Sequence, residues 1–140
     1  MSIEIKDSDC GLGNIIVGRS IIKEEEFFDA LKKHLRQDED KFKKYRYSLS
    51  DYTSTIHFDI SNKSLEIITE YCDIALNVNP EAVVAIVAKH ELLYGLAKMW
   101  EILSNKTNWE KMVFRNREDA EVWIRTRVKE KYGIDDLTFR

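Results

Sequence analysis

Seven consecutive apolar residues, Ala82 to Ala88, restrict the choice of fold more than any other stretch of this chain. The run is rich in valine and follows Asn77 to Pro80, a segment that contains the only proline. It is far shorter than the roughly 20 apolar residues that span a bilayer. An unbroken apolar run of this length is typical of a parallel strand that is covered on both faces. We therefore expect an α/β protein with this run in the middle of its sheet.

Other segments carry strand signals. Residues 3–5 alternate apolar and polar side chains, and a glycine-containing turn separates them from the apolar residues 15–17, which predicts an opening hairpin. Residues 45–51 alternate aromatic or aliphatic side chains with polar ones, and we expect this strand to end near Asp51 or Tyr52. Residues 112–114 predict one more short strand. The sheet should therefore have about five strands.

The first two predicted helices lie between these strands. Three glutamates after Lys23 precede Phe27, Leu31 and Leu35, whose spacing of four indicates an amphipathic helix. Ser61 offers an N-cap for a second helix. The apolar stripe of that second helix would contain Leu65, Ile68, Cys72 and Ala75.

Two more helices are predicted in the second half of the chain. The third covers Glu91 to Leu103, and the fourth begins after Asn116 as N-cap and ends before Gly133 at the C′ position. The inward positions of the fourth helix would be Ala120, Trp123, Ile124 and Val128. This order of elements implies a mixed, mostly parallel sheet of about five strands with four helices packed on it.

Length and composition exclude several classes of protein. A chain of 140 residues is expected to form a single domain, residues 1–140, and 44% hydrophobic with 34% charged residues argues against disorder. The net charge of −3 gives no positive field to attract nucleic acid. The first ten residues lack the apolar region of a signal peptide, and Cys10 and Cys72 are too far apart for a local metal or redox pair. We expect a cytoplasmic protein with no integral membrane segment, no nucleic-acid partner and no cofactor.

Polar residues near the carboxyl ends of the predicted strands form a candidate rim, because ligands of open α/β sheets gather there. The rim residues are Asp51, Ser54, His90, Tyr94 and Arg115. They include a serine, a histidine and an aspartate, but no Gly-x-Ser-x-Gly elbow accompanies them. His34, His57 and His90 lack the spacing of a metal motif. We expect no catalytic residues, no metal site and no enzymatic activity.

The third helix carries more apolar residues than a sheet-packing helix needs. One stripe contains Leu93, Leu96, Ala97, Trp100 and Leu103, and it already suffices for the core. Leu92, Met99 and Ile102 are then surplus, and Gly95 costs about 1 kcal/mol relative to alanine inside a helix. Gly95 implies either tight packing of the helix on the sheet or a surface for a partner or apolar ligand. The candidate interface is Leu92, Gly95, Met99 and Ile102.

The order of elements resembles that of STAS domains, the fold of sulfate-transporter domains and anti-sigma factor antagonists. Residues 83–124 resemble more specifically the SpoIIAA-like group of small bacterial and archaeal proteins, also known as STAS/SEC14-like. The residues that carry this resemblance are Val84, Ala85, Ile86 and Val87, then Tyr94, Gly95, Leu96, Ala97 and Met99, then Val113, Phe114 and Arg115, and finally Glu118, Ala120 and Trp123. The remainder of the chain shares only the order of elements.

The resemblance implies a non-enzymatic regulatory or protein-binding module, whose partner would be another protein or a second copy of the chain. Its SEC14-like side implies the alternative, a carrier of a small apolar or lipid-like ligand. In anti-sigma factor antagonists of this fold, a serine at the start of the helix after the third strand is phosphorylated. Here that region holds residues 51–55 and Ser61, without a compact Asp-Ser-Ser-Gly arrangement. Ser61 is thus a candidate phosphosite or a simple helix cap.

Overall fold

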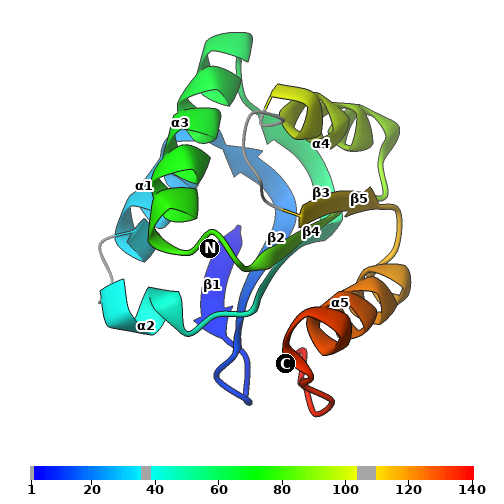
Figure 1. The fold of residues 1–140 in the computed structure, drawn as a ribbon. Helices are drawn as coiled ribbons and strands as arrows, with labels where there is room; N and C mark the ends of the chain where they lie inside the picture. Colours follow the sequence, from blue (N-terminus) through cyan, green and yellow to red (C-terminus); the bar gives the residue numbers. More distant parts are fainter. Residues whose placement is uncertain (1, 36–38, 104–109) are drawn as a thin grey trace.

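The strands of the sheet lie side by side in the order in which they occur in the sequence (Figure 1). The computed structural model describes residues 2–35, 39–103 and 110–140. The strands in these ranges are β1 (Ile3–Asp7), β2 (Gly13–Lys23), β3 (Tyr47–Asp59), β4 (Val83–Val87) and β5 (Glu110–Phe114). The first two strands are antiparallel, and every later neighbour pair is parallel. The predicted opening hairpin and the mostly parallel sheet are confirmed.

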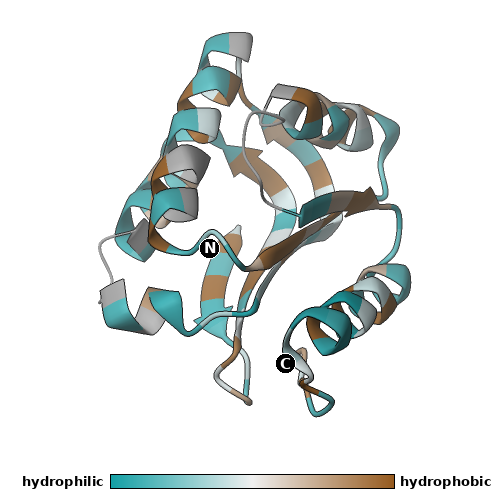
Figure 2. Cartoon of the chain, viewed as in Figure 1, coloured by the Kyte–Doolittle hydropathy of each residue, from teal (hydrophilic) through white to brown (hydrophobic). Residues whose placement is uncertain are grey.

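Helices cover both faces of this sheet, three on one side and one on the other (Figure 1). They are α1 (Glu24–Leu35), α3 (Asn62–Val78) and α4 (Glu91–Leu103) on the first face and α5 (Arg117–Tyr132) on the second. These are the four helices that the sequence predicts, and a fifth, short helix of five residues, α2 (Glu39–Lys43), adds to them. Figure 2 shows hydrophobic residues along the strands and hydrophilic residues over most of α5.

The apolar run forms an interior strand, as predicted. In β4, Val83, Ala85 and Val87 are fully buried against α5, and parallel strands β3 and β5 flank it. The expectation that this run is the middle of the sheet is wrong in one respect, since β4 is fourth of the five described strands and β3 is central. The reason is that the described strands lie in sequence order, with three before β4 and one after it.

Strand β3 is longer than the sequence predicts. It does not end near Asp51 or Tyr52 but continues to Asp59, paired with the second half of β2 across two irregularities in register. The continuation is rich in Thr, Ser and His and therefore resembles a loop in composition. Thr55 and Phe58 are nevertheless buried, and their spacing of three departs from the strand period of two because a shift in register lies between them.

The two faces have separate cores. On the face of α1, α3 and α4, aromatic rings interlock; those of Phe27 and Phe58, for example, have centroids 4.8 Å apart in an edge-to-face arrangement. On the other face, α5 buries Ala120, Ile124 and Val128 completely, as predicted. Trp123 is only half-buried, against Phe114 of the edge strand β5, with 5.7 Å between ring centroids.

The segment after α5 completes the second core. Leu137 and Phe139 are buried, and the Phe139 ring lies 5.0 Å from that of Tyr47. The amide of Asp9 donates to the carbonyl of Arg140 at 2.7 Å, so this segment is tied to the β1–β2 turn. The sequence gives no periodic signal for this packing.

Both ends of α5 have the predicted caps. The side chain of Asn116 accepts a hydrogen bond from the amide of Asp119 at 2.9 Å. Gly133 adopts the left-handed conformation, with φ of 70°, and its amide donates to the carbonyl of Lys129. Among the described residues, no helix combines the length and apolarity needed to cross a membrane.

Candidate functional site

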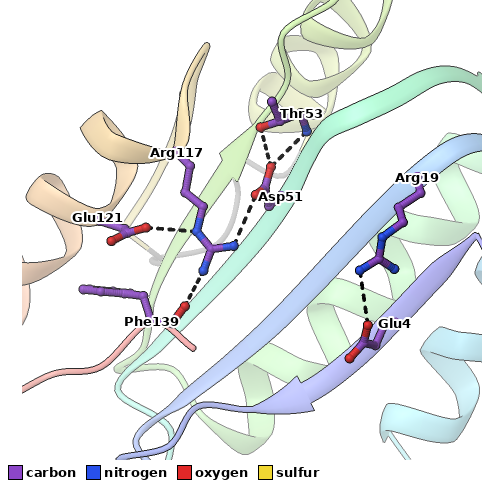
Figure 3. Close-up of polar contacts among 7 residues, drawn as sticks. All are labelled: Glu4, Arg19, Asp51, Thr53, Arg117, Glu121 and Phe139. Atoms are coloured by element: carbon purple, nitrogen blue, oxygen red, sulfur yellow. Dashed lines mark hydrogen bonds and ion pairs between the residues drawn. The ribbon is translucent and has the colours of Figure 1, made fainter.

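The candidate rim is divided between separate polar groups. Asp51, at the end of the part of β3 that pairs with β4, is 9% exposed and accepts hydrogen bonds from the amide and hydroxyl of Thr53. Its second oxygen, Oδ2, lies 3.3 Å from Nη1 of Arg117 (Figure 3). Arg117 also contacts Glu121 at 2.9 Å and donates to the carbonyl of Phe139. The Asp51 carboxylate therefore joins the sheet to α5.

A second polar group lies at the start of α4. The guanidinium of Arg115 stands 3.9 Å from the centroid of the Tyr94 ring and forms a 2.6 Å ion pair with Glu91. The ion pair raises the pKa of Arg115, through a hydrogen bond to Glu91. His90 precedes this helix and is exposed, and its carbonyl accepts from the Tyr94 amide at 2.8 Å.

Ser54 is not among the residues that bond to Asp51 or Arg115 in these two groups, although it follows Thr53 in the chain. It is exposed in the continuation of β3, opposite Arg19 of β2. Because Asp51 is bonded to Thr53 and Arg117, its carboxylate is engaged by residues other than His90. The described residues also hold no group of three or more His, Cys, Asp and Glu side chains that could bind a metal ion. Nothing in this arrangement assembles a nucleophile, base and acid.

Ser61 occupies the N-cap position of α3. Its hydroxyl accepts a hydrogen bond from the amide of Ser64 at 3.2 Å and lies 2.9 Å from the Ser64 hydroxyl. The side chain is exposed, and Glu24 of α1 is 3.5 Å away. Phosphorylation of Ser61 stays a prediction, and a phosphate there would face this carboxylate.

The surplus residues of α4 are exposed. Leu92 is 80%, Ile102 71% and Met99 43% exposed. Gly95 is also exposed, and a Cβ atom added to it would have nothing within 4 Å. The reading of Gly95 as a close approach to the sheet is therefore wrong, because the residue faces outward. We call Leu92, Gly95, Met99 and Ile102 the α4 stripe.

A cavity of about 170 Å³ lies between the sheet and helices α1, α3 and α4. Its wall is mostly aromatic and aliphatic, with Asn14, His34, Ser48 and Ser50 among the polar lining residues. The sequence analysis does not identify this cavity. The only sequence signal is the pair of serines on β3, which alternate with the large residues Tyr47 and Leu49 of the opposite face.

The turn between β1 and β2 contains Cys10, whose thiol has a lowered pKa. Burial alone would raise the pKa of Cys10, but hydrogen bonds with Ser8 and Thr138 outweigh it and lower that pKa from 9.0 to about 7. The sulfur lies 3.3 Å from the Ser8 hydroxyl and 3.4 Å from the Thr138 amide. The sequence could not show this, because Thr138 is brought to Cys10 only by the segment after α5.

This chain is similar to known proteins in structure and not detectably in sequence. No family model matches the chain, and neither does any curated protein. The anti-sigma factor antagonist SpoIIAA, in its unphosphorylated form, matches over 91% of this chain and 97% of its own, with a TM-score of 0.52 and 5% identity. An uncharacterized protein of the DUF3478 family with a SpoIIAA-like fold, from Shewanella loihica PV-4, matches over 87% and 91%, with a TM-score of 0.48 and 18% identity. The first of these likenesses confirms the predicted α/β fold.

Proposed function

We propose that this protein, which has the STAS-like fold of SpoIIAA, is a non-enzymatic regulatory module that binds a second copy of itself through the α4 stripe. The observation that carries the proposal is the exposure of Leu92 and Ile102, two large apolar side chains at 80% and 71%. The similarity to an anti-sigma factor antagonist supports a regulatory role.

The α4 stripe is a continuous surface. Its four residues are spaced three, four and three apart, so they lie on one side of the helix. The opposite side of α4 buries Leu93, Ala97 and Trp100. Soluble monomers seldom leave such a contiguous apolar surface in water. A protein surface that covers the stripe would remove this exposure.

The shape of the stripe favours a second copy as the occupant. Met99 projects from the helix, whereas Gly95, one turn earlier, leaves open space. In a contact with two-fold symmetry, each Met99 would enter the space above the partner's Gly95, since the same patch serves both subunits. Two ion pairs flank the stripe, Glu91 with Arg115 and Lys98 with Glu101, so its rim carries both positive and negative charges. Such a mixed rim does not select a strongly charged partner.

The test is the molar mass in sedimentation velocity and light scattering, from about 1 µM to about 1 mM protein, a range that detects dimers of modest affinity. We expect the wild-type mass to rise toward that of a dimer. Met99→Glu and Ile102→Lys should stay monomeric. Val122→Lys, at a residue of α5 that is 59% exposed, is the matched control and should dimerise as the wild type does.

Gly95→Lys separates association from folding. Lysine favours a helix over glycine by about 0.5–1 kcal/mol, and no neighbouring atom obstructs it. The variant should therefore be at least as stable as the wild type to urea and yet remain monomeric. A wild-type mass that stays monomeric at all concentrations, or dimers that persist in Met99→Glu, would refute the proposal.

A further inference from the structure

The cavity beneath α1, α3 and α4 arises from a difference in side-chain volume between the two faces of β3. Tyr47 and Leu49 fill the face toward α5 and are fully buried. Ser48 and Ser50 alternate with them and line the cavity on the other face. Side chains normally fill the space between a sheet and its helices, whereas about 170 Å³ stays unfilled here, in a pocket that is partly open to solvent.

The cavity leaves part of strands β3 and β4 uncovered by helices. Ile86 belongs to β4 and pairs with Ser50 of β3, yet it is only half-buried. Ser48 on the neighbouring strand is half-buried as well. Both residues line the cavity, which explains why they keep exposed surface in the middle of a sheet that helices cover.

One polar side chain in the wall lacks a full set of partners. Asn14 is 3% exposed, and its Nδ2 contacts Nε2 of His34. Its Oδ1 has no hydrogen-bond partner among the described residues. Buried polar groups in proteins normally have a partner.

The lining and the volume define the guest. Many of the lining residues on this face are aromatic: Phe27, Phe42, Tyr45, Tyr52, Phe58, Tyr71 and Trp100. Aromatic walls favour an aromatic guest, through edge-to-face and offset contacts. A cavity of roughly 150 Å³ holds benzene, whereas pockets for drug-sized ligands have about 300–1,000 Å³. The space is therefore suited to one small ring system and is too small for a two-chain lipid.

We propose that this cavity binds a small aromatic molecule with one hydrogen-bond donor, of the phenol or indole class, whose donor is satisfied by Asn14. The ring would replace the missing side-chain volume opposite Ser48 and Ser50. This site is distinct from the α4 stripe, because α4 lines the cavity with Leu93, Leu96, Ala97 and Trp100.

Matched probes test the donor. Phenol and toluene, or indole and 1-methylindole, have similar shapes, but only the first of each pair donates a hydrogen bond. Isothermal titration calorimetry on the wild type should show the donor probe binding about tenfold more tightly, because a buried acceptor left unpaired disfavours the other probe. Asn14→Leu should reduce this ratio to about two or below while toluene still binds. Equal binding of each pair to the wild type would overturn the role of Asn14.

Filling the cavity tests its location. Ala97→Phe places a ring in the space from α4, and Ser50→Leu places a branched aliphatic side chain there from β3. Either variant that folds should lose binding of all four probes by about tenfold or more, since the volume is occupied. Val122→Phe, on the exposed side of α5, is the control and should bind as the wild type does. The proposal fails if no probe binds the wild type at millimolar concentration, or if both folded cavity-filling variants bind unchanged.

Discussion

The guanidinium of Arg117, in the first turn of α5, lies 3.3 Å from the carboxylate of Asp51 in the central strand of the sheet. The Asp51 side chain is 12% exposed and that of Arg117 30%. Figure 3 also shows the pair of Arg19 and Glu4, 3.5 Å apart, in which both side chains are about half exposed. The two ion pairs have the same chemistry and differ in burial, so they form a natural comparison.

Arg117→Ala should lower the free energy of unfolding by about 1–3 kcal/mol, because it leaves a buried carboxylate with fewer partners. Arg19→Ala should change it by less than about 0.5 kcal/mol, since exposed ion pairs contribute little. Urea titrations followed by circular dichroism provide both values. Equal effects of the two substitutions would mean that the Arg117 contact does not fix α5 on the sheet.

In α5, truncation of Ile124 should destabilise the protein more than truncation of its larger neighbour Trp123. Ile124→Ala should cost about 2–5 kcal/mol, because Ile124 is fully buried. Trp123→Ala should cost less than Ile124→Ala, and less than the roughly 3–5 kcal/mol typical of a fully buried tryptophan, since the indole is half-buried beside Phe114. Denaturant midpoints measure the order, and a larger effect at Trp123 would contradict it.

Substitutions at Ser61 should distinguish the contribution of its N-cap hydrogen bond from the effect of a negative charge at this position. Ser61→Ala should cost about 1 kcal/mol, because the amide of Ser64 loses its acceptor. Ser61→Asp keeps an acceptor at the helix N-terminus but faces Glu24, so its stability should fall between those of Ser61→Ala and the wild type. Ser61→Asp combined with Glu24→Gln should restore the stability of the wild type, because the opposing carboxylate is removed. Thermal unfolding measures this change. If Ser61→Ala is as stable as the wild type, the cap is dispensable.

Cys10 should react with iodoacetamide in a pH-dependent way that an ordinary thiol does not show. In a Cys72→Ser background, the rate should rise with a midpoint near pH 7, because the thiolate is the nucleophile and the pKa of Cys10 is lowered to about 7. Ser8→Ala removes one hydrogen bond to the sulfur and should move the midpoint upward.

The same shift affects stability. The pKa of Cys10 in the folded protein is below the value of 9.0 for an unfolded thiol, so the thiolate stabilises the fold. That contribution is complete above about pH 9 and is lost as the pH falls through about 7. Cys10→Ser should therefore flatten the rise in stability between these two values. An unchanged pH dependence would contradict the lowered pKa.

Several features of the fold could be predicted because they rest on local patterns. The spacing of Phe27 and Leu31 predicts α1, and the side-chain acceptor of Asn116 and the left-handed Gly133 mark the ends of α5. The apolar run predicts an interior parallel strand. These signals depend on residues near one another in the chain, so they survive without knowledge of tertiary contacts.

The end of β3 and the candidate sites were harder to predict, because they depend on contacts between distant segments. Thr55 is polar and yet completely buried, with its hydroxyl close to Gly18 of β2. Asn14 and His34 meet in the cavity wall although twenty residues separate them. The role of Arg117 likewise requires the carbonyl of Phe139. The periodicity of apolar residues along the sequence does not predict such contacts.

The division of the two cores also has a consequence for the order in which the chain is synthesised. Every buried member of the first core precedes residue 101, whereas the second core needs α5 and the segment through Phe139. A growing chain that has reached α4 can already close the first face, while Val83, Ala85 and Val87 on the other face still await their cover. The nascent protein thus presents an open apolar sheet surface to its surroundings, and this interval is when a chaperone would be needed most.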